Sequence, residues 1–256
     1  MSFKLAMIQM LVEGGQKRRN LQRAQELITK AAAQRADVIL MPEAMPLGWT
    51  HSSARKDADA IPDGESCAIL RELARAHSAY ICSGIIERSG EHIFNSAVLI
   101  GPDGDLLLHH RKLNELDIAH HLYARGDRLN VVHTSIGVFG LMICADAFVK
   151  GQVISRTLGV MGANVILSPC AWAVDAEHDN ARDPYGQLWL DNYQPVAREF
   201  NLWIAGASNV GWITDGPWKG RKCIGCSLLI DPRGDAVVRG PYGDKAEAIL
   251  YSEITT

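Results

Sequence analysis

The chain has 256 residues, of which 47% are hydrophobic and 21% are charged, and its formal net charge at pH 7 is −3. This composition is ordinary for a globular protein, and the length allows a single domain over residues 1–256. Charges of both signs are interspersed, so the sequence indicates neither a nucleic-acid partner nor a membrane surface. No apolar run reaches the ~20 residues of a spanning helix, and the six cysteines are irregularly spaced, so we expect a cytoplasmic protein without a disulfide scaffold.

Helices and strands are predicted to alternate along the chain, because apolar residues recur at helical spacing in some segments and form short runs in others. In chain order we expect a strand at Lys4–Met10, a helix at Lys17–Gln34, a strand at Val38–Met41, a helix at Ser66–His77, strands at Tyr80–Ile86, Ala97–Ile100, Leu106–His110 and Val138–Ile143, a helix at Gln152–Gly162, a strand at Val165–Leu167, a helix at Gly186–Phe200, and strands at Trp203–Ala207, Ser227–Ile230 and Ala248–Tyr251. Alternation of this kind predicts an α/β fold.

An internal repeat organises these elements. ADVILMPEA at 36–44 matches ANVILSPCA at 163–171, and NSAVLIGPDGD at 95–105 resembles GCSLLIDPRGD at 225–235. Both pairs are about half the chain apart, which is too long a period for a solenoid. The repeat predicts two similar halves that face one another, and chance similarity among strand-and-turn sequences is the alternative.

Three reactive side chains follow apolar runs at comparable positions. Glu43 ends VILMPE, Lys112 ends LLLHHRK, and Cys144 ends VFGLMIC. Open α/β sheets place their chemistry just beyond such strand ends, where a thiol, a carboxylate and an ammonium can together perform acyl transfer. Each residue also has an ordinary interpretation, since a lone cysteine usually packs in a core and a lone lysine is usually solvated.

Four motifs occur in order: PEAMPLGW at 42–49, HRKLNEL at 110–116, GLMICADAF at 140–148 and GANVILSPCAW at 162–172. Together they resemble the nitrilase superfamily of carbon–nitrogen hydrolases, over about residues 3 to 252. The resemblance implies a four-layer αββα sandwich with a Glu43–Lys112–Cys144 triad. It also implies no cofactor, no metal, and a homodimer or larger homo-oligomer.

The same resemblance implies a reaction. Cys144 attacks a small amide while Glu43 takes the thiol proton, and Lys112 with the backbone N–H of Ala145 stabilises the oxyanion. Ammonia or an amine leaves first, and water then hydrolyses a thioester acyl-enzyme. Asp146 is expected to anchor the turn that presents the thiol. Trp172 is expected to line the pocket entrance, with core packing as its alternative.

The chain departs from the family pattern at two places. Many relatives carry a second acidic residue about eight positions after the lysine, where this chain has His120 followed by His121. Glu115 lies nearer Lys112 and is a candidate for that role, although it could instead contact the lysine or lie on a loop surface. The arginines that grip a substrate carboxylate in carbamoyl amino acid hydrolases are replaced here by Ala147-Phe148.

These departures favour an uncharged, cationic or aromatic substrate over an amino acid anion. Acidic residues and tryptophans that follow Cys144 in the sequence also favour such a substrate: Asp175, Glu177, Asp179, Asp183 and Asp191, with Trp172, Trp189, Trp212 and Trp218. The alternative is that the acidic residues form a solvated surface and that the tryptophans pack in the core. Aspartate at position 146 resembles the amidases and carbamoylases of the family more than its true nitrilases, and this resemblance modestly favours an amide substrate over a nitrile.

Other functions stay open from the sequence. A nitrilase or an N-carbamoyl amine hydrolase could use the same triad, and a thiol acyltransferase would pass the acyl group to an amine or alcohol. A Cys–His enzyme would need His109, His110 or His133 near Cys144. A non-catalytic binding protein with this fold is the last alternative. Cys223 and Cys226 lack the second ligand pair that a structural zinc site needs.

Overall fold

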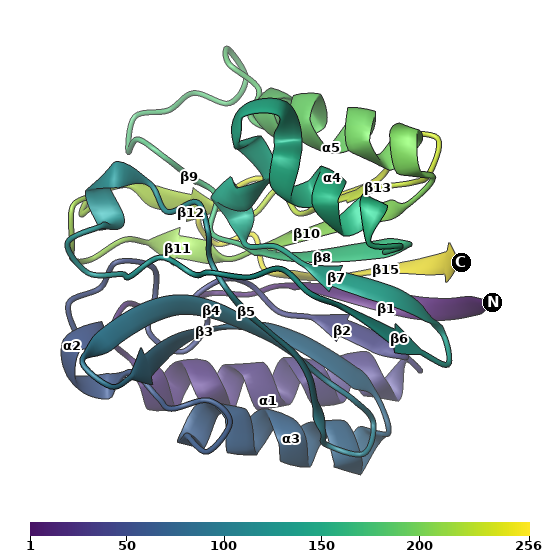
Figure 1. Ribbon diagram of the computed structural model, residues 1–256. Helices are drawn as coiled ribbons and strands as arrows, with labels where there is room; N and C mark the ends of the chain where they lie inside the picture. The colour runs from purple at the N-terminus through teal and green to yellow at the C-terminus, as the bar shows by residue number, and fades with distance from the viewer.

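Two six-stranded sheets form the centre of the computed structural model, which describes residues 1–256 (Figure 1). The first sheet has the spatial order β15 (Ala248–Thr255), β1 (Ser2–Gln9), β2 (Val38–Leu40), β3 (Tyr80–Ser89), β4 (His92–Ile100) and β5 (Leu106–Arg111). The second has the order β14 (Ala236–Arg239), β13 (Leu228–Ile230), β10 (Trp203–Ser208), β8 (Val165–Cys170), β7 (Gly137–Leu141) and β6 (Val131–Thr134). A small third sheet joins β11 (Val210–Trp212), β12 (Lys222–Ile224) and β9 (Ala173–Val174).

Helices cover the outer face of each large sheet. Figure 1 shows α1 (Lys17–Ala33) and α3 (Glu65–His77) against the first sheet, and α4 (Val153–Val160) and α5 (Gln187–Phe200) against the second. In α1 the residues that face the sheet recur every three or four positions and are buried, namely Leu21, Ala24, Ile28 and Ala31. The predicted four-layer αββα sandwich is confirmed. None of the helices combines the length and the apolar character needed to cross a membrane.

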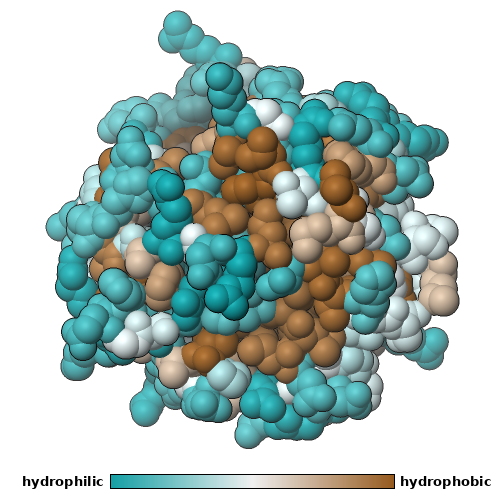
Figure 2. Space-filling view, in the orientation of Figure 1, coloured by the Kyte–Doolittle hydropathy of each residue, from teal (hydrophilic) through white to brown (hydrophobic).

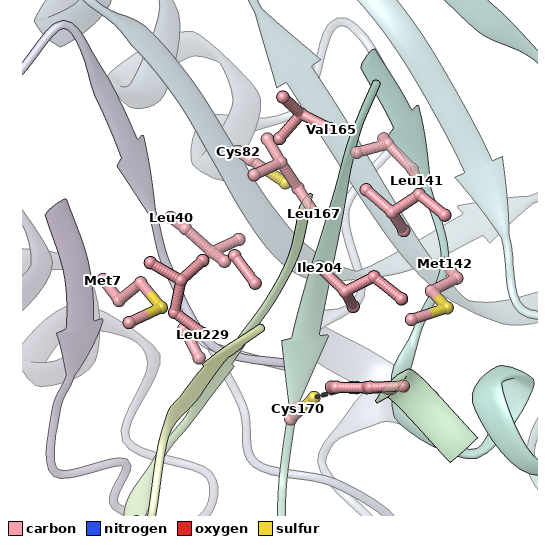
Figure 3. Packing of buried hydrophobic residues seen from close by; sticks show 14 of the residues in the cluster. Met7, Leu40, Cys82, Leu141, Met142, Val165, Leu167, Cys170, Ile204 and Leu229 are labelled. Carbon is pink, nitrogen blue, oxygen red and sulfur yellow. Dashed lines mark hydrogen bonds between the residues drawn. The ribbon is translucent and has the colours of Figure 1, made fainter. Parts of the chain in front are cut away.

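The largest apolar core lies between the two sheets and continues beneath α4 and α5. In Figure 3, Met7 and Leu40 of the first sheet belong to the same cluster as Leu167 and Leu229 of the second. Successive residues of β1 alternate between this core and a separate one under α1 and α3, as the period of two in a strand requires. Side chains buried this completely contribute about 1.5–3 kcal/mol each.

The predicted internal repeat is visible in the sheet topology. β1, β2 and β3 run parallel and continue into the antiparallel strands β4 and β5, and β7, β8 and β10 continue in the same way into β13 and β14. Both hairpins close with the same turn, in which Gly104 (φ 78°) and Gly234 (φ 81°) each donate to the carbonyl three residues earlier. The two halves therefore repeat one structural unit.

Several elements were not predicted from the sequence. β6, β9, β11, β12 and β14 have two to four residues each and lie largely at sheet edges or in the small sheet. Such segments are too short to show a periodic pattern. β4 starts at His92, five residues before the predicted strand, because it extends the hairpin with β3 beyond the apolar run.

Glu87 on β3 joins three neighbouring strands. Its carboxylate accepts hydrogen bonds from Ser96 (2.6 Å), His109 (2.8 Å) and Arg111 (2.5 and 2.9 Å). Burial alone would raise the pKa of Glu87, but these hydrogen bonds outweigh it and lower that pKa to about 2. The group therefore stabilises the fold above the unfolded pKa, and this contribution is lost as pH falls from about 4.5 toward 2.

We accordingly expect Glu87→Gln to lower the free energy of unfolding at pH 7 by about 2–3 kcal/mol. Urea denaturation at pH 7 and pH 3 would measure the difference, which should shrink at the lower pH. Glu91→Gln is the control, because Glu91 is exposed on the same hairpin. An equal loss of stability at both pH values would contradict the assigned protonation.

Candidate active site

The three predicted catalytic residues meet at one cavity of about 210 Å³. Glu43 lies in the turn after β2, Lys112 directly follows β5, and Cys144 lies three residues beyond β7. The first two belong to one large sheet and the third to the other, so the cavity forms where ends of the facing sheets come together. A larger groove of about 510 Å³ between the edge strands β5 and β6 contains none of the three. On the face of the molecule turned toward the viewer in Figure 2, apolar side chains gather near the centre.

Glu43 and Lys112 form a buried ion pair. The Lys112 Nζ lies 2.7 Å from Glu43 Oε1, and the two side chains are 2% and 1% exposed. Asn95 donates from Nδ2 to the same oxygen at 2.7 Å. Both donors contact Oε1, so Oε2 carries no protein hydrogen bond and is free to accept a proton.

Lys112 stays cationic in this setting. Burial alone would lower its pKa, but Glu115 and Glu43 outweigh burial and hold that pKa well above its usual range. The Glu115 Oε2 lies 3.6 Å from Lys112 Nζ. Burial raises the pKa of Glu115, while Lys112 opposes the rise. Glu115 contacts Lys112 but is not among the residues that line the cavity.

Cys144 adopts a backbone conformation that is uncommon for a residue with a side chain. Its φ is 45°, at the start of a 3₁₀ turn over Cys144–Phe148. Such conformations persist where the surrounding structure holds them, and they gather at active sites. Burial, the Cys170 side chain and Glu43 raise the pKa of the Cys144 thiol well above its usual range, and Lys112 opposes them without cancelling the rise. The resting thiol is therefore protonated and needs a base to become a nucleophile.

Asp146 ties the loop that carries the lysine to the loop that carries the nucleophile. One carboxylate oxygen accepts the backbone N–H groups of Leu113 (3.0 Å) and Asn114 (2.8 Å). The other accepts the N–H of Ile143 at 2.9 Å and lies 2.8 Å from His110 Nε2. Asn114 adds a bond from its side chain to the Ala145 carbonyl at 2.6 Å. Asp146 is thus the anchor expected from the sequence, and it holds both loops.

Replacing Asp146 with asparagine should disturb both loops at once, because an amide N–H would face backbone donors. We expect turnover to fall by about 10–100-fold, as misplacement of reacting groups commonly does. The melting temperature should fall as well. Asp117→Asn is the matched control, since the Asp117 side chain is fully exposed on the lysine loop. Wild-type turnover in Asp146→Asn would refute the anchoring role.

Six of the fourteen residues that line the cavity are aromatic. Trp172 lines it, but at 1% exposure it lies inside the cavity and not at the entrance, and it stacks on Trp189 with ring centroids 4.5 Å apart. Trp49 meets Trp218 edge to face at 4.9 Å. Tyr185 accepts a hydrogen bond from Trp189 Nε1 at 2.9 Å. Further apolar side chains complete the wall: Leu116, Ala145, Phe148, Ala171, Ala173 and Leu188.

Other candidates from the sequence lie elsewhere. His120 and His121 are exposed, so Glu115 is the acidic group that the fold places beside Lys112. His109 contacts Glu87 and His110 contacts Asp146, and His133 is exposed, so none of these histidines lines the cavity beside Cys144. The acids of the segment after β9 are all on the surface: Asp175, Glu177, Asp179, Asp183 and Asp191. Trp212 is 46% exposed and lies outside the cavity.

Sequence reasoning missed Asn95, Asn114 and the wall residues Trp49 and Tyr185. Trp49 ends the PEAMPLGW motif, and that position alone could have suggested it. The two asparagines act through contacts between strands and loops that no local pattern announces.

The chain matches a family model described as carbon-nitrogen hydrolase over residues 4–256. It is 31% identical to an omega-amidase NIT2 of Mus musculus, with 99% of this chain and 88% of that protein covered. It is 29% identical to a nitrilase of Pyrococcus abyssi, with 91% and 83% covered. Among solved structures, a carbon-nitrogen hydrolase from Helicobacter pylori G27 superposes with a TM-score of 0.86 at 22% identity, over 98% and 88% of the two chains. An amidase from Nesterenkonia sp. superposes with a TM-score of 0.82 at 19% identity, over 99% and 90%. The chain belongs to the carbon–nitrogen hydrolase family of the nitrilase superfamily.

Proposed function

We propose that this carbon–nitrogen hydrolase cleaves a small amide through a thioester acyl-enzyme on Cys144, with release of ammonia or an amine. The observation that carries the proposal is the meeting of Glu43, Lys112 and Cys144 at one cavity. A protonated thiol, a carboxylate oxygen without a donor and a fixed cation are the groups that such a reaction needs.

The reaction begins when Glu43 Oε2 takes the thiol proton as Cys144 Sγ attacks the amide carbonyl carbon. The oxyanion of the tetrahedral intermediate is stabilised by Lys112 Nζ and by the N–H of Ala145, which lies in the first turn of the 3₁₀ segment where N–H groups lack helical partners. The intermediate collapses, the C–N bond breaks, and the proton on Glu43 passes to the leaving nitrogen.

Water completes the cycle. Glu43 removes a proton from a water molecule as it attacks the thioester, and the C–S bond breaks to give a carboxylic acid and the free thiol. Each proton removed is returned, so no cofactor enters the scheme. Glu115 and Asp146 position Lys112 and the two loops, and they do not touch the substrate.

An amide is favoured over a nitrile by Asp146 and by the omega-amidase and amidase among the similar proteins. Ammonia release across matched small amides, nitriles and N-carbamoyl amines tests the proposal. We expect the protein to hydrolyse the amides, and we expect this activity to require the Cys144 thiol. Turnover of nitriles or carbamoyl amines alone would overturn the amide assignment. Transfer to added hydroxylamine with no acid formed would identify an acyltransferase.

A further inference from the structure

The charges that line the active-site cavity are already paired. Fourteen residues line it, and Glu43 and Lys112 are the only charged side chains among them. These two lie 2.7 Å from one another and are needed for the chemistry. The cavity therefore offers neither a free cation to a substrate carboxylate nor a free carboxylate to a substrate ammonium.

Three of the four indole N–H groups of the aromatic wall are engaged or covered, and that of Trp218 is neither. Trp189 donates its indole N–H to Tyr185, and the indole nitrogens of Trp49 and Trp172 are covered by protein atoms. Phe148 packs against Trp189 with ring centroids 5.6 Å apart. Beyond the three reactive groups, the Tyr185 hydroxyl and the Trp218 indole N–H, the wall presents carbon surface to the part of the substrate that extends from the amide.

Two arginines lie near this wall, and neither lines the cavity. Arg239 lines a separate cavity that shares Trp172, Tyr185 and Trp189 with this one. The Arg221 guanidinium lies over the Trp218 ring, 4.3 Å from its centroid, and its Nε pairs with Asp175 at 2.9 Å. Arg221 does not line the cavity. It stacks on the Trp218 ring and does not place a second positive charge inside the cavity.

We propose that the enzyme takes amides whose acyl group is uncharged and apolar, aliphatic or aromatic, and rejects amides that carry a carboxylate on the acyl group. The inference rests on the proposed function. Burying an apolar acyl group against the apolar wall is favourable in free energy, because both surfaces leave water. A carboxylate would lose its hydration in the same place without gaining a hydrogen-bond or ion-pair partner. The two buried reactive charges lie at the inner end of the cavity, and Leu188, which is 52% exposed, lies at its rim. The acyl group thus extends from Cys144 along the aromatic wall.

Two amides of nearly the same shape test this. 4-Methylpentanamide and succinamate share an amide and two methylenes, and they differ in an isopropyl group against a carboxylate. We expect kcat/KM for 4-methylpentanamide to exceed that for succinamate by about 100-fold or more, since the carboxylate would be buried unpaired. 3-Phenylpropanamide should be hydrolysed as well. A succinamate value equal to or above that of 4-methylpentanamide would overturn the inference.

A charge placed at the rim should change this preference. In Leu188→Arg the ratio should shift toward succinamate by about 10-fold, because the new cation can pair with its carboxylate. Leu188→Glu is the matched control and should shift the ratio the other way. If the ratio of the two kcat/KM values were unchanged in both variants, the acyl group would not extend along this wall, and the proposal would be wrong.

Binding separates this inference from the proposed reaction. Four of the six tryptophans line the cavity, so ligand binding to the Cys144→Ala protein can be followed by tryptophan fluorescence without turnover. Tighter binding of 4-methylpentanamide than of succinamate supports the inference even if the wild-type protein hydrolyses neither, a result that would refute only the proposed reaction. Equal binding, or binding of neither, would overturn the inference itself.

Discussion

Replacing Cys144 with alanine is expected to lower amide turnover by a factor on the order of 10⁴–10⁶, as loss of a catalytic nucleophile does elsewhere. The substitution removes the thiol sulfur to which the proposed mechanism attaches the acyl group. It leaves the Glu43–Lys112 pair and the aromatic wall in place. Binding should therefore survive while chemistry stops.

Ammonia release would measure the loss of turnover, and the mass of the intact protein would show whether an acyl group is attached. The wild-type protein, quenched during turnover, should show an acyl adduct that Cys144→Ala lacks. Cys67→Ala is the matched control, since Cys67 lies on the buried face of α3 in the other apolar core. Full turnover by Cys144→Ala would refute the thioester scheme.

Glu43→Gln is expected to lower turnover by about 10²–10⁴-fold, the usual contribution of a general base. The amide oxygen of glutamine can still accept from Lys112 and Asn95 at the position of Oε1. Its NH₂ group would occupy the position of Oε2, where the proton of Cys144 has to go. The change thus removes the base and keeps the geometry.

Steady-state kinetics would measure the loss of turnover, and alkylation would measure the fraction of protein with a reactive Cys144 thiol. Alkylation of Cys144 by iodoacetamide at alkaline pH should still reach completion in Glu43→Gln, which shows that the nucleophile is intact. Glu26→Gln, on the exposed face of α1, should behave like the wild type. Unchanged turnover in Glu43→Gln would remove Glu43 from the catalytic scheme.

Local patterns predicted the alternating helices and strands and the reactive residues at strand ends, and the resemblance to the nitrilase superfamily implied the four layers and the triad. Apolar runs mark buried strands, and the ends of parallel strands gather at one edge of a sheet. The repeat added a second copy of the same pattern. Glu43, Lys112 and Cys144 could therefore be placed together before any contact was known.

The remaining features depend on register and loop path, which no local pattern encodes. Spacing could not choose between Glu115 and His120 beside Lys112, since the choice depends on how the loop after β5 turns. The acids between Asp175 and Asp191 were interpreted as part of the substrate preference, yet all of them are solvated. The wall of tryptophans and the absence of an unpaired charge in the cavity support the uncharged and aromatic part of that preference, but not its cationic part.

The three residues of the proposed triad are divided between the two large sheets, with Glu43 and Lys112 after strands of one and Cys144 after a strand of the other. The apolar layer between the sheets thus acts as a spacer that sets the gap between Cys144 and its partners. Filling or emptying this layer, at Met7 or Leu229 for example, changes the thickness of the spacer as well as stability. A shift of 1 Å between reacting atoms can cost about 10²-fold in rate, so substitutions far from the cavity can silence an enzyme that remains folded.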